Sequence, residues 1–233
     1  MNIVWYLSPA LTFLFPPLVF PTLIMAWYKY FEVETWKYNF LERTIEERKG
    51  VEVWHKDVQF FDVFDAKKQL RGSFYLDLYA RSKKRGGAWM DVCVDRRSLN
   101  ADQTIVQLPV AYLTCNFNGP VGNKPALLTH DEVVTLFHEF GHGIHHMLTQ
   151  VNASGVAGIN GVAWDAVELP SQFLENWCWQ PEALSFISGH YQTGEALPKA
   201  MLDKMLAAKN FQSAMQMLRQ LEFSLFDFIM HAE

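Results

Sequence analysis

The sequence has little cysteine, no long run of basic residues and no internal repeat, and each absence narrows its function. Cys93, Cys115 and Cys178 are an odd number at wide spacings, so no disulfide framework is expected and a reducing, cytoplasmic setting fits. The net charge is −5, and the one basic cluster, at residues 81–85, predicts a hairpin turn rather than a nucleic-acid site. At 233 residues the chain can bury a substantial core in one or two domains.

Charge is also missing from the first 28 residues, which hold no charged side chain. Residues 3–28 are mostly Leu, Phe, Val, Trp and Ile and are long enough to span a membrane. Prolines interrupt the stretch, and each interior proline costs a helix about 3 kcal/mol. There is no basic start and no small-residue cleavage site, so a signal peptide is not indicated.

Three interpretations stay open for residues 1–43. They could form a membrane anchor with Trp27 and Tyr28 at its edge, a buried apolar segment, or a non-native start. We favour the non-native start, and a membrane would be a partner only through residues 3–28.

The pattern H-E-x-x-H at residues 138–142 is the most informative part of the sequence. Helical residues four apart share a face, so His138 and His142 could bind one metal ion. Glu139 could then take a proton from a metal-bound water. Upstream, residues 129–132 (THDE) predict a capping box that starts this helix. The alternative is a pair of core histidines with Glu139 at a solvated edge.

A zinc site with three protein ligands and an open fourth position needs one more donor. Glu168 and Glu175 are seven residues apart and could point the same way from one helix. We choose Glu168, because Asp165 then lies three residues before it and could orient a ligand histidine. Asp165-x-x-Glu168 also fits a second capping box, and the spacing alone does not separate these interpretations.

The remaining segments predict a small sheet followed by helices. Residues 42–49 are charged and predict a helix that ends at Gly50, and residues 152–161 are too rich in glycine for a continuous helix. The latter form either a mobile loop over the site or a plain connector. Alternation predicts strands at 58–65, 71–80, 86–94 and 110–116, a turn-rich link at 118–125, and helices from Pro181 onward joined at 194–198.

Five ordered segments carry a family resemblance. They are RGSFYLDLY (71–79), RGGAW (85–89), PVAYLTCNF (109–117), the helix at 137–146 and VELPSQFLENW (167–177). Together they resemble the M3 family of zinc oligopeptidases, the thimet oligopeptidase group, from about Thr44 to the last residue. Long blocks in the same order are far more specific than H-E-x-x-H alone.

The resemblance implies a site for one zinc ion per chain. The zinc ligands would be His138, His142 and Glu168. Glu139 would be the general base, and Asp165 and Glu175 would be supporting carboxylates. His145 lies seven residues after His138, on the same face but two turns away. It is therefore expected in the supporting layer or in packing rather than as a ligand.

The resemblance also implies the fold and the substrate class. Residues 44–233 would form part of a mainly α-helical metallopeptidase core, zincin-like, with a small β-sheet. An edge strand in such peptidases holds the substrate backbone by strand addition, and Ala111-Tyr112-Leu113-Thr114 is the expected strand. Its alternative is an ordinary strand of the sheet. The family cuts short oligopeptides in a channel that excludes folded proteins, so the expected function is a zinc metalloendopeptidase.

One part of the family pattern is missing within this chain. A histidine and tyrosines downstream of the third ligand stabilise the transition state in the family, and no such segment follows Glu168 here. We therefore expect a partial catalytic domain, with a catalytically incomplete zinc-binding fragment as the alternative function. Apolar residues keep helical spacing almost to the end, as if the last helix continued: Phe211, Met215, Leu218, Leu221, Leu225 and Ile229.

Overall fold

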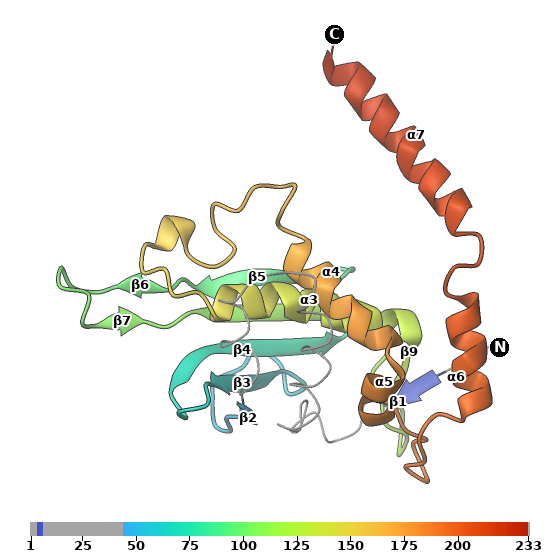
Figure 1. Ribbon diagram of the computed structural model, residues 1–233. Coiled ribbons are helices and arrows are strands. Elements are labelled where there is room, and N and C mark those ends of the chain that lie inside the picture. The colour runs from blue at the N-terminus through green and yellow to red at the C-terminus, as the bar shows by residue number, and fades with distance from the viewer. Residues whose placement is uncertain (1–3, 7–43, 233) are drawn as a thin grey trace. The chain divides into compact units, whose positions relative to one another are not determined.

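The computed structural model describes residues 4–6 and 44–232 (Figure 1). The expectations for residues 1–43 therefore lie outside the described residues, apart from a three-residue strand, β1 (Val4–Tyr6). Within the described ranges, no helix is long and apolar enough to cross a membrane. The chain divides into two compact units, Met1–Ala196 and Leu197–Glu233.

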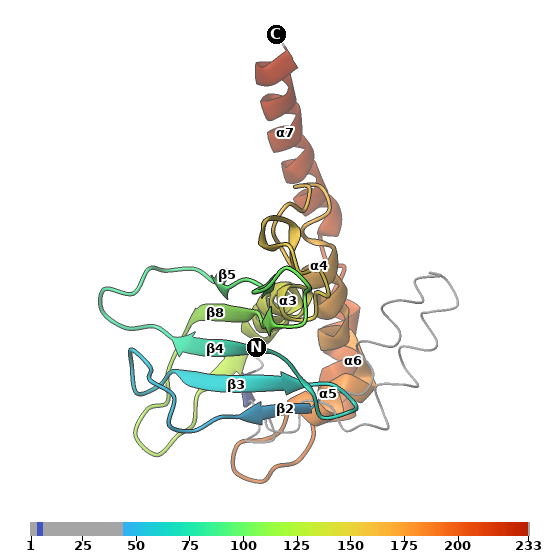
Figure 2. The same ribbon diagram turned by 90° about the vertical axis from the view of Figure 1, so that its left-hand side faces the viewer.

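The first unit is built on a five-stranded mixed sheet with the order β2-β3-β4-β8-β5. Figure 2 shows this order, with β5 at one edge and β2 at the other. All neighbours are antiparallel except β4 and β8, which run parallel. The strands are β2 (Thr44–Glu47), β3 (Gln59–Phe64), β4 (Leu70–Tyr79), β5 (Trp89–Val94) and β8 (Val110–Phe117). The four predicted strands are confirmed, with ends shifted by up to three residues.

Two local predictions are wrong. Residues 44–47 form the edge strand β2 rather than a helix, because they pair with β3 and Arg48 forms an ion pair with Asp62 across the two strands at 2.6 Å. Residues 81–85 form a turn but no hairpin, because β4 and β5 lie on opposite sides of β8. The side chain of Lys84 turns inward, with its Nζ 2.8 Å from Oδ1 of Asp77.

The remaining elements are two short strand pairs and the helices. β1 pairs antiparallel with β9 (Leu127–Thr129), and β6 (Arg97–Ser98) pairs with β7 (Val106–Gln107). The three cysteines are free thiols, as predicted. The helices are α3 (His130–Met147), η2 (Ser154–Val156), α4 (Leu169–Glu175), η3 (Asn176–Trp179), α5 (Pro181–Ile187), α6 (Lys199–Ala208) and α7 (Ser213–Ala232).

Helix α3 starts where the capping box predicts. The Thr129 hydroxyl accepts a hydrogen bond from the Glu132 amide at 3.2 Å, and the Glu132 carboxylate accepts one from the Thr129 amide at 2.7 Å. Two of the amides left free at the helix start are thereby satisfied. The apolar side of α3 packs on one face of the sheet, where Phe140 meets Phe74 edge to face with ring centroids 5.7 Å apart.

Gly141 lets α4 approach α3 closely. A Cβ at this position would lie 2.5 Å from Cα of Ser171 and 2.6 Å from the carbonyl oxygen of Pro170. No side chain larger than hydrogen fits at that distance. Since Glu168 and Glu175 lie at the two ends of α4, this contact brings both carboxylates to the H-E-x-x-H face of α3.

The second unit consists of α6 and α7. Both were expected as helices after Pro181, and both are present. α6 buries Met205, whereas no residue of α7 is buried.

Candidate metal centre

Three potential metal ligands, two from α3 and one from the residue that precedes α4, converge. His138 and His142 stand one turn apart on α3, and Glu168 lies immediately before α4. Oε2 of Glu168 is 3.1 Å from Nε2 of His138 and 3.1 Å from Nε2 of His142. One donor atom from each residue lies within 4.8 Å of the others. The structure thus brings together the three residues that the sequence pointed to as ligands.

The chemistry of these donors fits a divalent transition metal. Two imidazole nitrogens and one carboxylate oxygen form a donor set that zinc uses where a fourth position stays open. Burial lowers the pKa of His142, which favours the neutral ring that can act as a ligand. Burial alone would raise the pKa of Glu168, but the Ser171 hydroxyl, donating at 2.8 Å, and the nearby histidines hold it below its ordinary value.

Glu175 orients the first histidine. Its Oε1 lies 2.6 Å from Nδ1 of His138, so Nδ1–H donates to the carboxylate and Nε2 is left to face the other donors. Asp165 was also expected in a supporting role; it is exposed in the turn before α4, and its role stays a prediction. The alternative capping box from Asp165 to Glu168 is not formed, because α4 begins after Glu168.

Glu139 is buried beside the donor cluster, with 7% of its surface exposed. Burial is the main cause of a raised pKa, against the opposing effects of His138 and of a hydrogen bond from the Met90 amide. A carboxyl group of raised pKa is suited to take up and return a proton near neutral pH. His145 is partly buried and stands outside the donor set. Within the part that the structure describes, its Nδ1 has no hydrogen-bond partner.

The expectation that Ala111-Tyr112-Leu113-Thr114 forms a substrate-binding edge is wrong. These residues lie in β8, whose two sides are paired with β4 and β5, so its peptide groups are already used in the sheet. Ala111 and Leu113 are almost fully buried. The edge strand next to α3 is β5, which pairs with β8 on one side only. Sequence reasoning missed it, because no local pattern encodes the order of strands in a sheet.

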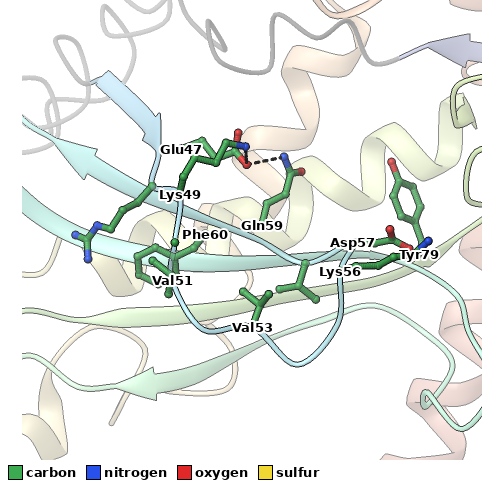
Figure 3. A pocket seen from close by; sticks show the side chains of 12 residues that line it. Glu47, Lys49, Val51, Val53, Lys56, Asp57, Gln59, Phe60 and Tyr79 are labelled. Atoms are coloured by element: carbon green, nitrogen blue, oxygen red, sulfur yellow. Dashed lines mark hydrogen bonds and ion pairs between the residues drawn. The ribbon is translucent and has the colours of Figure 1, made fainter.

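A separate pocket lies at the opposite edge of the sheet, by β2 and β3 (Figure 3). It has a volume of about 440 Å³ and is lined mainly by the loop between these strands. Arg48, Lys56, Phe60 and Tyr79 are among its lining residues. It shares no residue with the donor cluster.

Two histidines on one helical turn, a glutamate beside them and a carboxylate from the next helix are the donor pattern of metallopeptidases. The model of peptidase family M3 matches residues 29–233, and the chain belongs to this family. The resemblance read from the sequence is thereby confirmed.

The relatives agree with this assignment. Oligopeptidase A of Escherichia coli (strain K12) is 70% identical over 190 residues, which cover 82% of this chain and 28% of that protein. Oligopeptidase A of Haemophilus influenzae is 72% identical over 186 residues, covering 79% of this chain and 27% of that protein. Saccharolysin of Saccharomyces cerevisiae is 39% identical over 197 residues, which cover 83% of this chain and 27% of that protein. The chain therefore spans less than a third of the length of these relatives.

Proposed function

We propose that this chain carries the catalytic metal centre of a zinc metalloendopeptidase that hydrolyses short oligopeptides. The observation that supports it best is the convergence of His138, His142 and Glu168 beside the buried carboxyl of Glu139. The names of the relatives point to oligopeptides as the substrate class.

In this proposal Glu139 is the general base. A zinc ion, when bound, would supply Lewis-acid chemistry that lowers the pKa of water to about 7 and polarises the peptide carbonyl. Glu139 takes the proton from the attacking water and passes it to the leaving amine. Its burial supports this role, because burial raises the pKa of the carboxyl group and so favours uptake of the proton.

The other residues hold the ligands in place. Glu175 fixes the tautomer and the ring orientation of His138 through the 2.6 Å contact at Nδ1. The Ser171 hydroxyl donates to the Glu168 carboxylate at 2.8 Å and limits its rotation. Both groups lie on α4, which Gly141 allows to pack closely on α3.

The substrate backbone would bind along β5. An extended peptide adds to the free edge of a sheet through main-chain hydrogen bonds. β5 pairs with β8 on one side only and contacts α3, which already takes the carbonyl oxygen of Val94 through His146, so a peptide would add to the main-chain groups before Val94. A peptide along this edge would have a carbonyl within reach of the general base.

Hydrolysis of a quenched fluorescent oligopeptide by the zinc-loaded chain tests the proposal. Glu139→Gln should reduce turnover by about 10²–10⁴-fold, because it removes the proton acceptor. Glu182→Gln, an exposed carboxylate of α5, should leave turnover unchanged. Zinc affinity should be similar in all three proteins, measured by competition with a chelator.

Two other outcomes would be informative. Failure to bind zinc would refute the proposed metal centre. One bound zinc without any turnover would favour the alternative, a zinc-binding fragment that lacks groups needed to stabilise the transition state.

A further inference from the structure

Helix α3 holds the edge strand β5 at two places. The Met90 amide lies close enough to the Glu139 carboxylate to lower its pKa, and Nε2 of His146 lies 3.1 Å from the carbonyl oxygen of Val94. Four residues separate the two positions in the strand, about 13 Å. Seven residues separate them in the helix, about 10 Å. The strand and the helix therefore run alongside each other in the same direction, joined at both ends of this stretch.

His146 is fully buried and is committed to this contact. Since a carbonyl can only accept, Nε2 carries the proton, and Nδ1 is left as an acceptor with no hydrogen-bond partner among the described residues. Gly158 packs directly against this nitrogen, because a Cβ there would lie 2.5 Å from Nδ1 and φ is +61°. Only glycine adopts that conformation at that distance without strain.

The segment after β5 is tied to the segment after α3. Nδ2 of Asn160 donates to Oδ1 of Asp95 at 2.6 Å, and Nε of Arg96 donates to Oδ1 of Asn152 at 2.8 Å. The Ser98 amide donates to the carbonyl oxygen of Asn152 at 2.9 Å. Figure 1 shows the chain after α3 passing beside β5 and β6. These bonds join parts of the chain more than fifty residues apart.

We propose that His146, Asn152 and Asn160 form a strand-end clamp that fixes the position of β5 along α3 and so positions a bound peptide relative to Glu139. This rests on the proposed function, in which β5 receives the substrate backbone. The three are positioning residues, since none belongs to the donor cluster. Their contribution is geometric, because a displacement of about 1 Å at a reacting centre can reduce a rate by about 10²-fold.

The clamp holds the C-terminal end of β5, which is not the end near Glu139. In the proposed mechanism Glu139 engages the attacking water, so its interaction with the Met90 amide would change during turnover. The contact at Val94 and the bonds at Asp95 and Ser98 involve no group of the proposed chemistry. They keep β5 in place while the interaction between Glu139 and the Met90 amide changes.

The clamp is tested first without substrate. In the full zinc-loaded chain, Asn160→Ala removes the hydrogen bonds from Nδ2 to Asp95 and to the carbonyl oxygen of Ser154. Since only the first of them reaches the segment after β5, amide hydrogen exchange of residues 90–98 should rise by about fivefold. Exchange in α3 should not change. Asn100→Ala is the control, because that side chain bonds only within the loop between β6 and β7. A uniform increase, or no increase, would overturn the clamp.

A swap tests the specific contact. Asn160→Asp places two carboxylates together and should increase exchange further, and adding Asp95→Asn restores a donor opposite an acceptor. Exchange of residues 90–98 should move back toward the wild-type rate in the double variant, without fully reaching it, because Nδ2 of Asn160 also donates to the carbonyl oxygen of Ser154 at 2.9 Å and a carboxylate at this position cannot. If it does not, the effect of Asn160 is general destabilisation and the clamp is wrong. Asn160 is only half-buried, so these variants avoid the risk of misfolding that a substitution of the buried His146 carries.

Whether the clamp positions a bound peptide is tested by measuring the affinity of the chain for an oligopeptide. A fluorescently labelled oligopeptide should bind Asn160→Ala several-fold more weakly than wild type, while zinc affinity stays within about twofold. Equal peptide affinity in both proteins, or a parallel loss of zinc affinity, would overturn the inference. If wild type binds zinc but no peptide, the proposed function fails, and hydrogen exchange still decides whether the clamp exists.

Discussion

Helices α3 and α7 have similar lengths, 18 and 20 residues, and both carry apolar residues at helical spacing. They differ in what covers those residues. α3 packs against the sheet and α4, and most of its apolar residues are buried. Every residue of α7 is exposed in the part of the chain that the structure describes. The pattern of a helix thus specifies which face can be buried, but other segments decide whether it is.

The polar residues of α7 sharpen this contrast. They fall mainly on one narrow face, and apolar side chains take most of the remaining circumference. A helix of that kind is usually buried on several sides. The polar face consists of Ser213, Gln216, Gln220, Ser224, Asp227 and His231.

The largest expected difference between the two helices comes from matched methionines. Met147→Ala, in the last turn of α3 at 0% exposure, should lower the free energy of unfolding by about 3 kcal/mol through lost contacts and a cavity. Met215→Ala in α7, where the residue is 64% exposed, should change it by less than about 0.5 kcal/mol. Urea unfolding monitored by tryptophan fluorescence measures both. A large effect at Met215 would show that α7 is covered in solution.

A second pair of variants tests the close approach of α3 and α4. Gly141→Ala would force a Cβ to within 2.5 Å of backbone atoms of α4, and overpacking of this kind costs about 1–3 kcal/mol. Gly155→Ala is the control, because nothing lies within 4 Å of its Cβ position. Thermal unfolding compares them. If Gly141→Ala melts like the control, the two helices are farther apart in solution than the structure shows.

The sequence predicted α3 and its two histidines because both depend on local patterns, whereas spacing left the third ligand open and the family resemblance pointed to Glu168. The capping box fixes the start of the helix, and the i, i+4 spacing places His138 and His142 on one face. The seven-residue spacing of Glu168 and Glu175 indicated that both carboxylates face the same way, and both contact His138. The role of the ligands as a zinc site stays a prediction.

The wrong predictions depend on pairing between distant segments. β8 looks like a possible edge in isolation, and only its pairing with both β4 and β5 removes its free side. Residues 44–47 hold two glutamates, which favour a helix, but pairing with β3 decides their conformation. His146 was missed for the same reason, because its partner Val94 is 52 residues away.

A pH experiment compares a buried carboxylate of the first unit with an exposed one of α7. Burial alone would raise the pKa of Asp77, but hydrogen bonds from Arg81, Lys84 and Trp54 lower it from 3.8 to about 2. A lowered pKa stabilises the folded chain above the unfolded-state value, and this stability is lost as the pH falls toward 2. The contribution is about 2 kcal/mol.

The dependence of the free energy of unfolding on pH measures this contribution of Asp77. Between pH 4 and pH 2, wild type should lose about 2 kcal/mol more than Asp77→Asn in the free energy of unfolding. Asp227→Asn, at an exposed position of α7, should follow wild type. Equal slopes for wild type and Asp77→Asn would mean that the hydrogen bonds around Asp77 do not lower its pKa in the folded chain.

The smallest expected effect concerns two histidine–carboxylate pairs, one in each region. Glu175 contacts Nδ1 of His138 from another helix at 2.6 Å, whereas Asp227 reaches Nδ1 of His231 within α7 at 3.5 Å, where both side chains are more than 70% exposed. Glu175→Gln weakens the acceptor that fixes the His138 tautomer, and zinc affinity should fall by about tenfold. Asp227→Asn should not change zinc affinity. Competition with a chromophoric chelator measures both. If Glu175→Gln binds zinc as tightly as wild type, then Glu168 and the packing of α4 on α3 hold His138 in place without the hydrogen bond.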